Sequence, residues 1–330
     1  MQIWTTPADI PSDLGPTAVT IGIFDGVHKG HKAILDATVR LAKERGLIPV
    51  ALTFEPHPRL VHQPNLPTRL VTSLRDRLER LESAGIEAAY VQHYDLEYAK
   101  LSAADFVHSQ LVGTLRAKTI VVGEDARFGA HNSGDATMLS ELAAKDCVSV
   151  TVLADLRAGD GRRWSSTWVR ELLECGDVAG ARQVLGRPHR IRGSVQHGFK
   201  RGRELGFPTA NLKGPDLGEV PADGVYAGWL VRLAPGTRAT EHLPAAISVG
   251  TNPQFDGEER TVEAHVLGRS DLNLYGEEIA IDFIERLRPM MKLNSVAELL
   301  AQMDDDLRAT AEVLAVPVAG RICPSAVTAQ

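Results

Sequence analysis

The chain has few cysteines, few aromatic residues and no long apolar run. Its 330 residues include three cysteines, far apart at Cys147, Cys175 and Cys323. These exclude a disulfide scaffold and a cysteine-rich zinc module, and they fit a reducing compartment. No apolar run approaches the roughly 18 residues of a membrane helix, and the opening MQIWTTPADI lacks the basic and apolar regions of a secretion signal. We therefore expect a cytoplasmic protein without a membrane partner.

The chain also has no excess of positive charge. It carries 36 Lys and Arg residues against 42 Asp and Glu, a net charge of −6. This balance argues against a general nucleic-acid binder, so no nucleic-acid partner is expected. The length favours two domains. No pattern decides the oligomeric state, and a homo-oligomer stays open.

The first half alternates between two kinds of periodic segment. Strand-like apolar runs at 19–24, 48–54, 88–92, 119–122 and 148–153 alternate with helix-like segments at 31–45, 74–84, 103–115 and 138–144. Two short helices are expected at 165–175 and 177–185. This alternation predicts a parallel sheet with helices on both faces, whose ligands bind beyond the carboxyl ends of the strands.

The composition changes at residues 186–188, and the next hundred residues show no helical pattern. Short strand-like runs at 190–196, 225–233, 245–250, 260–267 and 278–284 are separated by Gly and Pro clusters. The spacing predicts an antiparallel barrel or sandwich, followed by one amphipathic helix at 295–314.

The segment 22–31, GIFDGVHKGH, predicts a phosphate site. A strand runs through Asp25-Gly26 into a helix whose first turn places His28 and His31 on one face. A helix N-terminus attracts phosphate, and imidazoles donate hydrogen bonds to its developing charge. The alternatives are a tight turn with incidental histidines, or a metal pair, for which no third ligand stands at a convenient spacing.

These residues carry a resemblance. His28-Lys29-Gly30-His31 matches the HxGH signature of the adenylyl- and cytidylyltransferases. Together with TFEPHP at 53–58, GEDARFG at 123–129 and SSTWVR at 165–170, it resembles the adenylyltransferase module of bacterial bifunctional riboflavin kinase/FAD synthetases. The resemblance implies a Rossmann-like nucleotidyltransferase domain, in which the FMN phosphate attacks the α-phosphate of ATP and pyrophosphate leaves.

The resemblance also implies roles for individual residues. His28 and His31 would stabilise the transition state. The residues expected to bind nucleotide or phosphate are Gly26, Gly30, Asp125, Ser165, Ser166, Thr167 and Arg170. Without the resemblance, the hydroxyl residues read as a helix N-cap and Asp125 as a solvated turn residue. Two positions depart from the family pattern: Ala126 replaces an aromatic residue, and Glu55 replaces Asp.

The second half carries a different candidate phosphate site. Residues 198–211 read GFKRGRELGFPTAN, and Gly198, Lys200 and Gly202 lie in a basic, glycine-bearing loop suited to a triphosphate. A solvated basic hairpin is the alternative, and the loop is not a Walker A sequence. The oxygens of Thr209 and Asn211 are hard ligands suited to Mg²⁺.

A carboxylate on a later strand is a candidate general base. Alternation in VEAHVL at 262–267 places Glu263 on the face opposite the valines, where it could accept a proton from a hydroxyl. A solvent-facing glutamate is the alternative, and from the alternation alone it is the more common case.

GFPTAN, PADGVYAG at 221–228, SVGTNPQF at 248–255 and VEAHVL follow the order of riboflavin kinases, which this half resembles. That implies a six-stranded Greek-key barrel with a C-terminal helix, and conversion of ATP and riboflavin to FMN. It also implies Mg²⁺–ATP binding by Thr209 and Asn211, proton acceptance by Glu263, nucleotide placement by Asn252 and a flavin contact from Arg288. Met291 and Leu293 depart from the pattern.

The sequence thus predicts an FMN adenylyltransferase domain at 1–186 and a riboflavin kinase domain at 187–330. Together they would make FMN and then FAD from riboflavin and ATP, with Mg²⁺. Two alternatives stay open: a riboflavin kinase whose N-terminal half is weak or repurposed, and a flavin-binding regulator without turnover.

Overall fold

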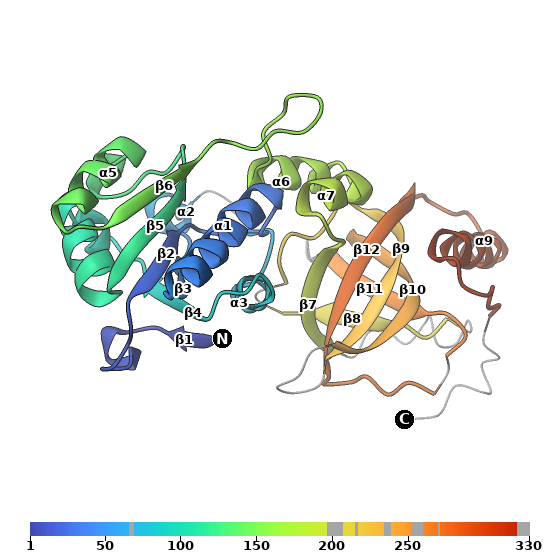
Figure 1. The fold of residues 1–330 in the computed structure, drawn as a ribbon. Helices are drawn as coiled ribbons and strands as arrows, with labels where there is room; N and C mark the ends of the chain where they lie inside the picture. The colour runs from blue at the N-terminus through green and yellow to red at the C-terminus, as the bar shows by residue number, and fades with distance from the viewer. Residues whose placement is uncertain are drawn as a thin grey trace. The chain divides into compact units, whose positions relative to one another are not determined.

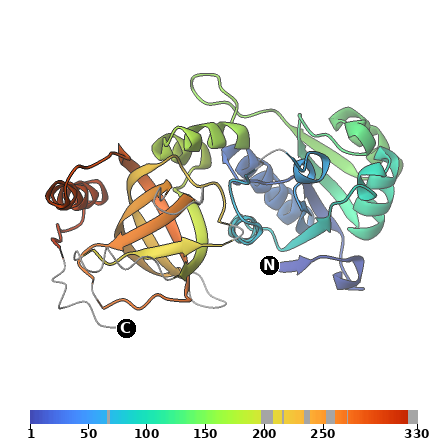
Figure 2. The same cartoon turned by 180° about the vertical axis from the view of Figure 1, so that it is seen from behind.

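The computed structural model describes residues 1–65, 69–196, 207–214, 217–233, 239–251, 260–269 and 271–321. Internal contacts divide the chain into two compact units, drawn in Figures 1 and 2. The first comprises Met1–Leu70 and Leu74–Ser166, and the second comprises Val71–Ser73 and Thr167–Gln330. The contacts group the helices after residue 166 with the second unit, and the functional boundary at 186/187 stays a prediction.

The first unit is built on a six-stranded, wholly parallel sheet. The strand order is β1-β4-β3-β2-β5-β6. The strands are β1 (Gln2–Trp4), β2 (Thr17–Ile21), β3 (Ile48–Glu55), β4 (Ala88–His93), β5 (Ala117–Gly123) and β6 (Ser149–Leu153). The five predicted strands are confirmed, and β1 is an additional edge strand paired with β4.

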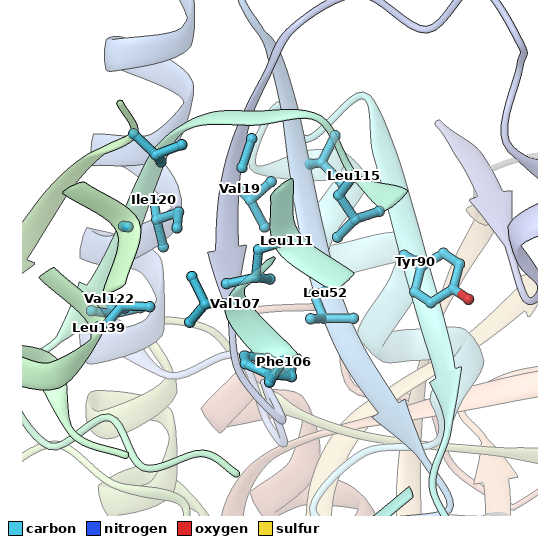
Figure 3. Packing of buried hydrophobic residues seen from close by; sticks show 14 of the residues in the cluster. Val19, Leu52, Tyr90, Phe106, Val107, Leu111, Leu115, Ile120, Val122 and Leu139 are labelled. Carbon is cyan, nitrogen blue, oxygen red and sulfur yellow. The ribbon is translucent and has the colours of Figure 1, made fainter. Parts of the chain in front are cut away.

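Helices cover both faces of this sheet, as the alternation predicts. They are α1 (Lys29–Arg45), α2 (Pro58–His62), α3 (Leu74–Ser83), α4 (Ala103–Asp105), the π-helix η3 (Phe106–Thr114) and α5 (Ala136–Lys145). On one face, Val19, Leu52 and Ile120 of the strands pack against Leu111 of η3 and Leu139 of α5 (Figure 3). The other face is covered by α1 and α3.

The order of the strands fixes where a ligand can bind. From β2 the chain proceeds to β3 and β4 on one side, then returns to β5 and β6 on the other. The sheet therefore changes winding direction between β2 and β5. Ligands of open parallel sheets bind beyond the strand ends at such a point.

One predicted helix differs from the structure. The pattern at 103–115 predicts a single α-helix, whereas the structure has one α-helical turn, α4, followed by the π-helix η3. Its apolar residues Phe106, Val107 and Leu111 all face the core. In a π-helix each hydrogen bond spans five residues instead of four, so these side chains are spaced differently around the helix than in an α-helix. The apolar periodicity of the sequence does not reveal this difference.

The second unit consists of two helices and a closed barrel. The helices are α6 (Ser166–Glu174) and α7 (Val178–Leu185). Asp177 caps α7 and accepts a hydrogen bond from the amide of Gly180 at 2.7 Å. At its other end Gly186 adopts a left-handed conformation with φ of 74°.

The barrel closes in the order β10-β11-β8-β7-β12-β9, with every neighbouring pair antiparallel. Its strands are β7 (His189–Gln196), β8 (Ala210–Lys213), β9 (Gly224–Leu233), β10 (Ala239–Thr251), β11 (Arg260–Val266) and β12 (Glu278–Pro289). Alternate residues such as Ile247, Val262 and Ile281 fill the interior. The predicted barrel with its C-terminal helix, α9 (Val296–Leu314), is confirmed, while β8 is a strand that the patterning did not indicate.

Within the described residues, no helix is both long and apolar enough to cross a membrane.

Candidate active sites

The turn between β2 and α1 has an unusual backbone. Phe24, Gly26 and Val27 have φ values of 54°, 77° and 39°. Left-handed conformations cost about 1–3 kcal/mol in residues that carry a Cβ, so Phe24 and Val27 must be held by their surroundings. Both side chains are buried in the core between α1, α3 and the sheet. The core thus determines the path by which the chain enters α1.

This turn brings the two predicted histidines into contact. The rings of His28 and His31 are stacked, with centroids 3.7 Å apart and an interplanar angle of 22°. His28 is the N-cap of α1, and its Nδ1 accepts a hydrogen bond from the His31 amide at 3.3 Å. Because Nδ1 is an acceptor, Nε2 carries the proton in the neutral ring and can donate it to a ligand.

Gly30 is required by the position of the His28 ring. A Cβ on Gly30 would lie 3.0 Å from Cε1 and 3.1 Å from Nδ1 of His28. Beside it, Nζ of Lys29 lies 4.8 Å from the ring centroid of Trp164, a cation–π contact. The glycine of the HxGH signature therefore makes room for the first histidine.

A pocket lies at this point, where the winding direction of the sheet changes. It is lined by the N-cap and first turns of α1, by the ends of β5 and β6 with the residues that follow them, and by the chain before α6: His28, Gly30, His31, Ala33, Ile34, Gly123, Asp125, Leu153, Ala154, Asp155, Leu156, Arg163 and Trp164. The predicted residues Gly30, Asp125 and both histidines thus share one pocket.

An arginine bridges two carboxylates at this pocket. Arg163 forms ion pairs with Asp125 and with Asp155, the latter at 3.0 Å. Burial raises the pKa of Asp155, Arg163 lowers it, and the nearby charges of Asp125 and Glu124 raise it further. The sequence motifs do not indicate Arg163, although it belongs to a basic pair that only Trp164 separates from SSTWVR.

The hydroxyl residues of that motif have different surroundings. Ser166 donates a hydrogen bond from Oγ to the carbonyl oxygen of Asp25 at 2.8 Å, in the same turn that positions His28. Ser165 is half-buried, whereas Thr167 is exposed. Thr167 and Arg170 belong to the second unit, so their roles at this pocket stay predictions.

A buried arginine holds the ends of β2 and β3 together. Arg77 of α3 is 1% exposed and donates hydrogen bonds to the carbonyl oxygens of Ile23 at 2.9 Å and Phe54 at 3.2 Å. It also forms an ion pair with Glu55. Glu55, which replaces the Asp of the family pattern, therefore keeps the negative charge that faces Arg77.

In the barrel, the predicted oxygen ligands form one group. Thr209 donates a hydrogen bond from Oγ1 to Oε2 of Glu263 at 3.2 Å. Asn211 on β8 and Ser248 on β10 are the register partners of Glu263 on either side. Directly paired residues lie on the same face of a sheet, so the three polar side chains form a row across β8, β11 and β10.

The environment of Glu263 suits a proton acceptor. Burial raises the pKa of its carboxyl, and the hydrogen bond from Thr209 lowers it by less. Its neighbours Val262 and Ala264 are each 1% exposed and point into the barrel, so Glu263 occupies the outer face as the alternation predicts.

Other predicted residues are placed differently. Gly198, Lys200, Gly202 and Asn252 lie outside the described residues. Arg288 forms a bidentate pair with Asp306 of α9, with both N···O distances at 2.8 Å. The guanidinium thus joins β12 to α9, and its contact with flavin stays a prediction.

The oxygens of this row could hold a magnesium ion. Within the described ranges, no three His, Cys, Asp or Glu side chains are grouped as metal ligands. The hydroxyl of Thr209, the amide of Asn211 and the carboxylate of Glu263 are the hard donors that Mg²⁺ accepts, and they suit an ion that keeps water and phosphate ligands.

Comparison with known proteins assigns both halves. Residues 10–168 match the family model for FAD synthetase, and residues 185–314 match that for riboflavin kinase. The bifunctional riboflavin kinase/FMN adenylyltransferase of Escherichia coli K12 is 36% identical, covering 87% of this chain and 90% of that protein. The protein of the same description from Bacillus subtilis is 32% identical, covering 90% and 92%.

A solved structure from Streptococcus pneumoniae, described as a macrolide-efflux protein, has a TM-score of 0.81 and 31% identity, covering 93% of this chain and 97% of that one. It agrees with the fold over both units.

The fold and the two sites define a two-part transferase with separate nucleotidyltransferase and kinase modules. The chain belongs to the bifunctional riboflavin kinase/FMN adenylyltransferase family. Because both halves match and the relatives are described by both activities, the bifunctional interpretation is favoured over a kinase with a repurposed half or a non-catalytic regulator.

Proposed function

We propose that the chain phosphorylates riboflavin to FMN at Glu263 in the barrel, and adenylylates FMN to FAD at the histidine pair beside the parallel sheet. Membership of the family supports both reactions. The observation that carries the second is the stacked pair itself, set at the N-terminus of α1 where the sheet changes direction. We retain 1–186 and 187–330 as the functional boundaries, and the cytoplasm as the place of reaction.

In adenylyl transfer, an FMN phosphate oxygen forms a bond to the α-phosphorus of ATP. The bond from that phosphorus to the bridging oxygen breaks, and pyrophosphate leaves. His28 would donate a hydrogen bond from Nε2 to the oxygens on which charge develops, and His31 would act beside it. The N-terminus of α1 adds a partial positive charge. No residue need form a covalent bond, so positioning and charge stabilisation supply the catalysis.

The remaining residues would hold the nucleotide. Gly26 and Gly30 let the phosphates approach the backbone, and Asp125 with Arg163 lies at the pocket rim. Ser165, Ser166, Thr167 and Arg170 would contact the distal phosphates. Because the Ser166 hydroxyl already donates its proton to the Asp25 carbonyl, Ser166 would donate to a phosphate oxygen from its backbone amide.

In the kinase reaction, Glu263 would take the proton of the ribityl 5′-hydroxyl as that oxygen bonds to the γ-phosphorus of ATP. The bond between the γ-phosphorus and the β,γ-bridging oxygen breaks and ADP leaves. Thr209 and Asn211 would hold Mg²⁺, which neutralises phosphate charge when it is bound. Gly198, Lys200, Gly202 and Asn252 would bind the nucleotide, and Arg288 the flavin side.

The test measures each reaction separately. The purified chain receives riboflavin, ATP and Mg²⁺, and riboflavin, FMN and FAD are separated by chromatography over time. FMN should appear first and FAD after it. The double variant His28→Ala/His31→Ala should stop at FMN.

Glu263→Gln is the reciprocal control. It should leave riboflavin unchanged but still convert supplied FMN to FAD. If both variants lost both reactions while folded, the assignment of the two sites would be wrong.

A further inference from the structure

A buried histidine lies one alternation beyond the proposed base. His265 is 4% exposed and shares the outer face of β11 with Glu263, two residues earlier. The pairs Ala210–Ala264 and Asn211–Glu263 fix the register between β8 and β11. Continued by one residue, this register sets His265 opposite Thr209, where β8 has not yet begun.

At that position the side chain of His265, and not the ladder between β8 and β11, bonds to the neighbouring backbone. Its Nδ1 lies 2.8 Å from the carbonyl oxygen of Pro208. A carbonyl oxygen can only accept, so Nδ1 carries the proton and donates it. Nε2 is buried and has no hydrogen-bond partner within the described residues. Burial lowers the pKa of His265 and so favours the neutral ring.

The bonded carbonyl belongs to the peptide group that leads into Thr209. A peptide is planar, so fixing the Pro208 oxygen also fixes the direction in which the chain enters Thr209. The Thr209 hydroxyl in turn donates to Glu263 at 3.2 Å. The rings of Phe207 and His265 pack in a T-shaped contact, with centroids 5.5 Å apart and an interplanar angle of 60°. His265 therefore contacts the loop that carries a proposed ligand, from the strand that carries the proposed base.

We propose that His265 is a positioning residue of the riboflavin kinase reaction: its Nδ1–H holds the Pro208–Thr209 peptide so that the Thr209 hydroxyl faces Glu263. It does not touch substrate and transfers no proton. The proposal rests on the proposed kinase function, and it assigns the histidine of VEAHVL a role that neither the base nor the metal ligands supply.

Two near-isosteric variants separate the hydrogen bond from the space that the ring fills. In His265→Asn the amide nitrogen can stand where Nδ1 stood and donate to Pro208, whereas His265→Leu has a similar volume and no donor. A third variant, His265→Gln, carries the same amide one bond farther along the side chain. FMN formation is measured at saturating riboflavin and Mg²⁺–ATP. Conversion of supplied FMN to FAD, together with thermal unfolding, reports that each variant is folded.

The Asn variant should keep kcat for FMN formation within about threefold of the parent, and the Leu and Gln variants should lose about ten- to a hundredfold, the range expected when one positioning hydrogen bond is lost. Thr209→Val should cost less in the His265→Leu background than in the parent, because both changes act through one hydroxyl. Equal losses in the Asn and Leu variants, or full activity in both, would overturn the proposal. A parent chain that forms no FMN would instead refute the proposed function.

Discussion

The imidazole of His28 rests against the backbone of Gly30, where any side chain would press on it: a Cβ there would lie 3.0 Å from Cε1. The same ring stacks on His31 at 3.7 Å. A single missing methyl group thus lets the first histidine cap α1 and face the second.

Gly30→Ala should lower the rate of FAD formation from FMN by about tenfold or more, since a misplaced catalytic group loses such factors. It should not lower the melting temperature, because alanine favours a helix more than glycine does. Rates measured with supplied FMN, alongside thermal unfolding, test both expectations.

Gly46→Ala is the matched control, because Gly46 ends the same helix with φ of 63° and a Cβ there would contact nothing within 4 Å. It should cost about 1 kcal/mol of stability and leave the rate unchanged. An unaltered rate in Gly30→Ala would show that the position of the His28 ring does not matter for transfer.

Arg77→Met should destabilise the first unit by about 2–4 kcal/mol, because the Phe54 carbonyl oxygen loses the Arg77 donor, the Ile23 carbonyl oxygen keeps only the Thr53 hydroxyl, and Glu55 loses its ion pair. Denaturant unfolding measures the loss. Glu55→Gln keeps a neutral acceptor at a side chain that is 35% exposed, so it should cost less than about 1 kcal/mol. A larger effect from Glu55→Gln than from Arg77→Met would mean that the ion pair, and not the carbonyl contacts, joins the two strands.

Glu263→Gln should lower the rate of FMN formation by at least about a hundredfold, the usual contribution of a general base. It should also raise the melting temperature at neutral pH. Burial raises the pKa of Glu263 in the folded chain, so the folded state binds more protons than the unfolded state just above the ordinary glutamate value. Its contribution to stability therefore falls as pH rises through that window, and the neutral amide avoids the loss.

Comparing melting temperatures of parent and variant between pH 4 and pH 8 tests the sign of this effect, since the difference should grow with pH and then level off. In the kinase assay of the parent, the acid limb of the rate profile should lie above the ordinary glutamate range. If the melting temperature of the variant exceeded that of the parent by less as pH rises, burial would not be what raises the pKa of Glu263.

Asp306→Asn should destabilise the packing of α9 on β12 by about 3 kcal/mol, because it leaves Arg288, 16% exposed in its side chain, without its carboxylate partner. Arg288→Lys keeps the charge but not the bidentate geometry, so it should cost less. Thermal unfolding ranks the two. If Arg288 also contacts flavin, Arg288→Lys should raise KM for riboflavin by more than its loss of stability explains. Asp306→Asn should not.

Much of this architecture could be predicted because it depends on local patterns. The apolar runs of β2 through β5 are mostly buried strands, and helical segments separate them along the chain. The histidines are three residues apart at a helix start, a spacing that places them together whatever the rest of the chain does. The alternation around Glu263 likewise determines which face of β11 it occupies.

Other features depend on partners distant in the chain. β1 and β8 have three and four residues, too few to show a period, and each exists because a neighbouring strand accepts it. Arg77 reads as an ordinary polar position of a helix, and only the fold shows that it is buried beneath two strand ends. The pairing of His265 with Pro208 crosses 57 residues and has no local signature.

The closure of the barrel bears on the order in which the chain can fold as it is synthesised. β12 pairs with β7 on one side and with β9 on the other, so until residues 278–289 have been made both partners present open edges. Unpaired edges invite association with other chains, and contacts between distant segments form slowly. The barrel thus completes its hydrogen bonding only after β12 has been made, and a ribosome stalled before β12 would hold an incomplete sheet prone to aggregation.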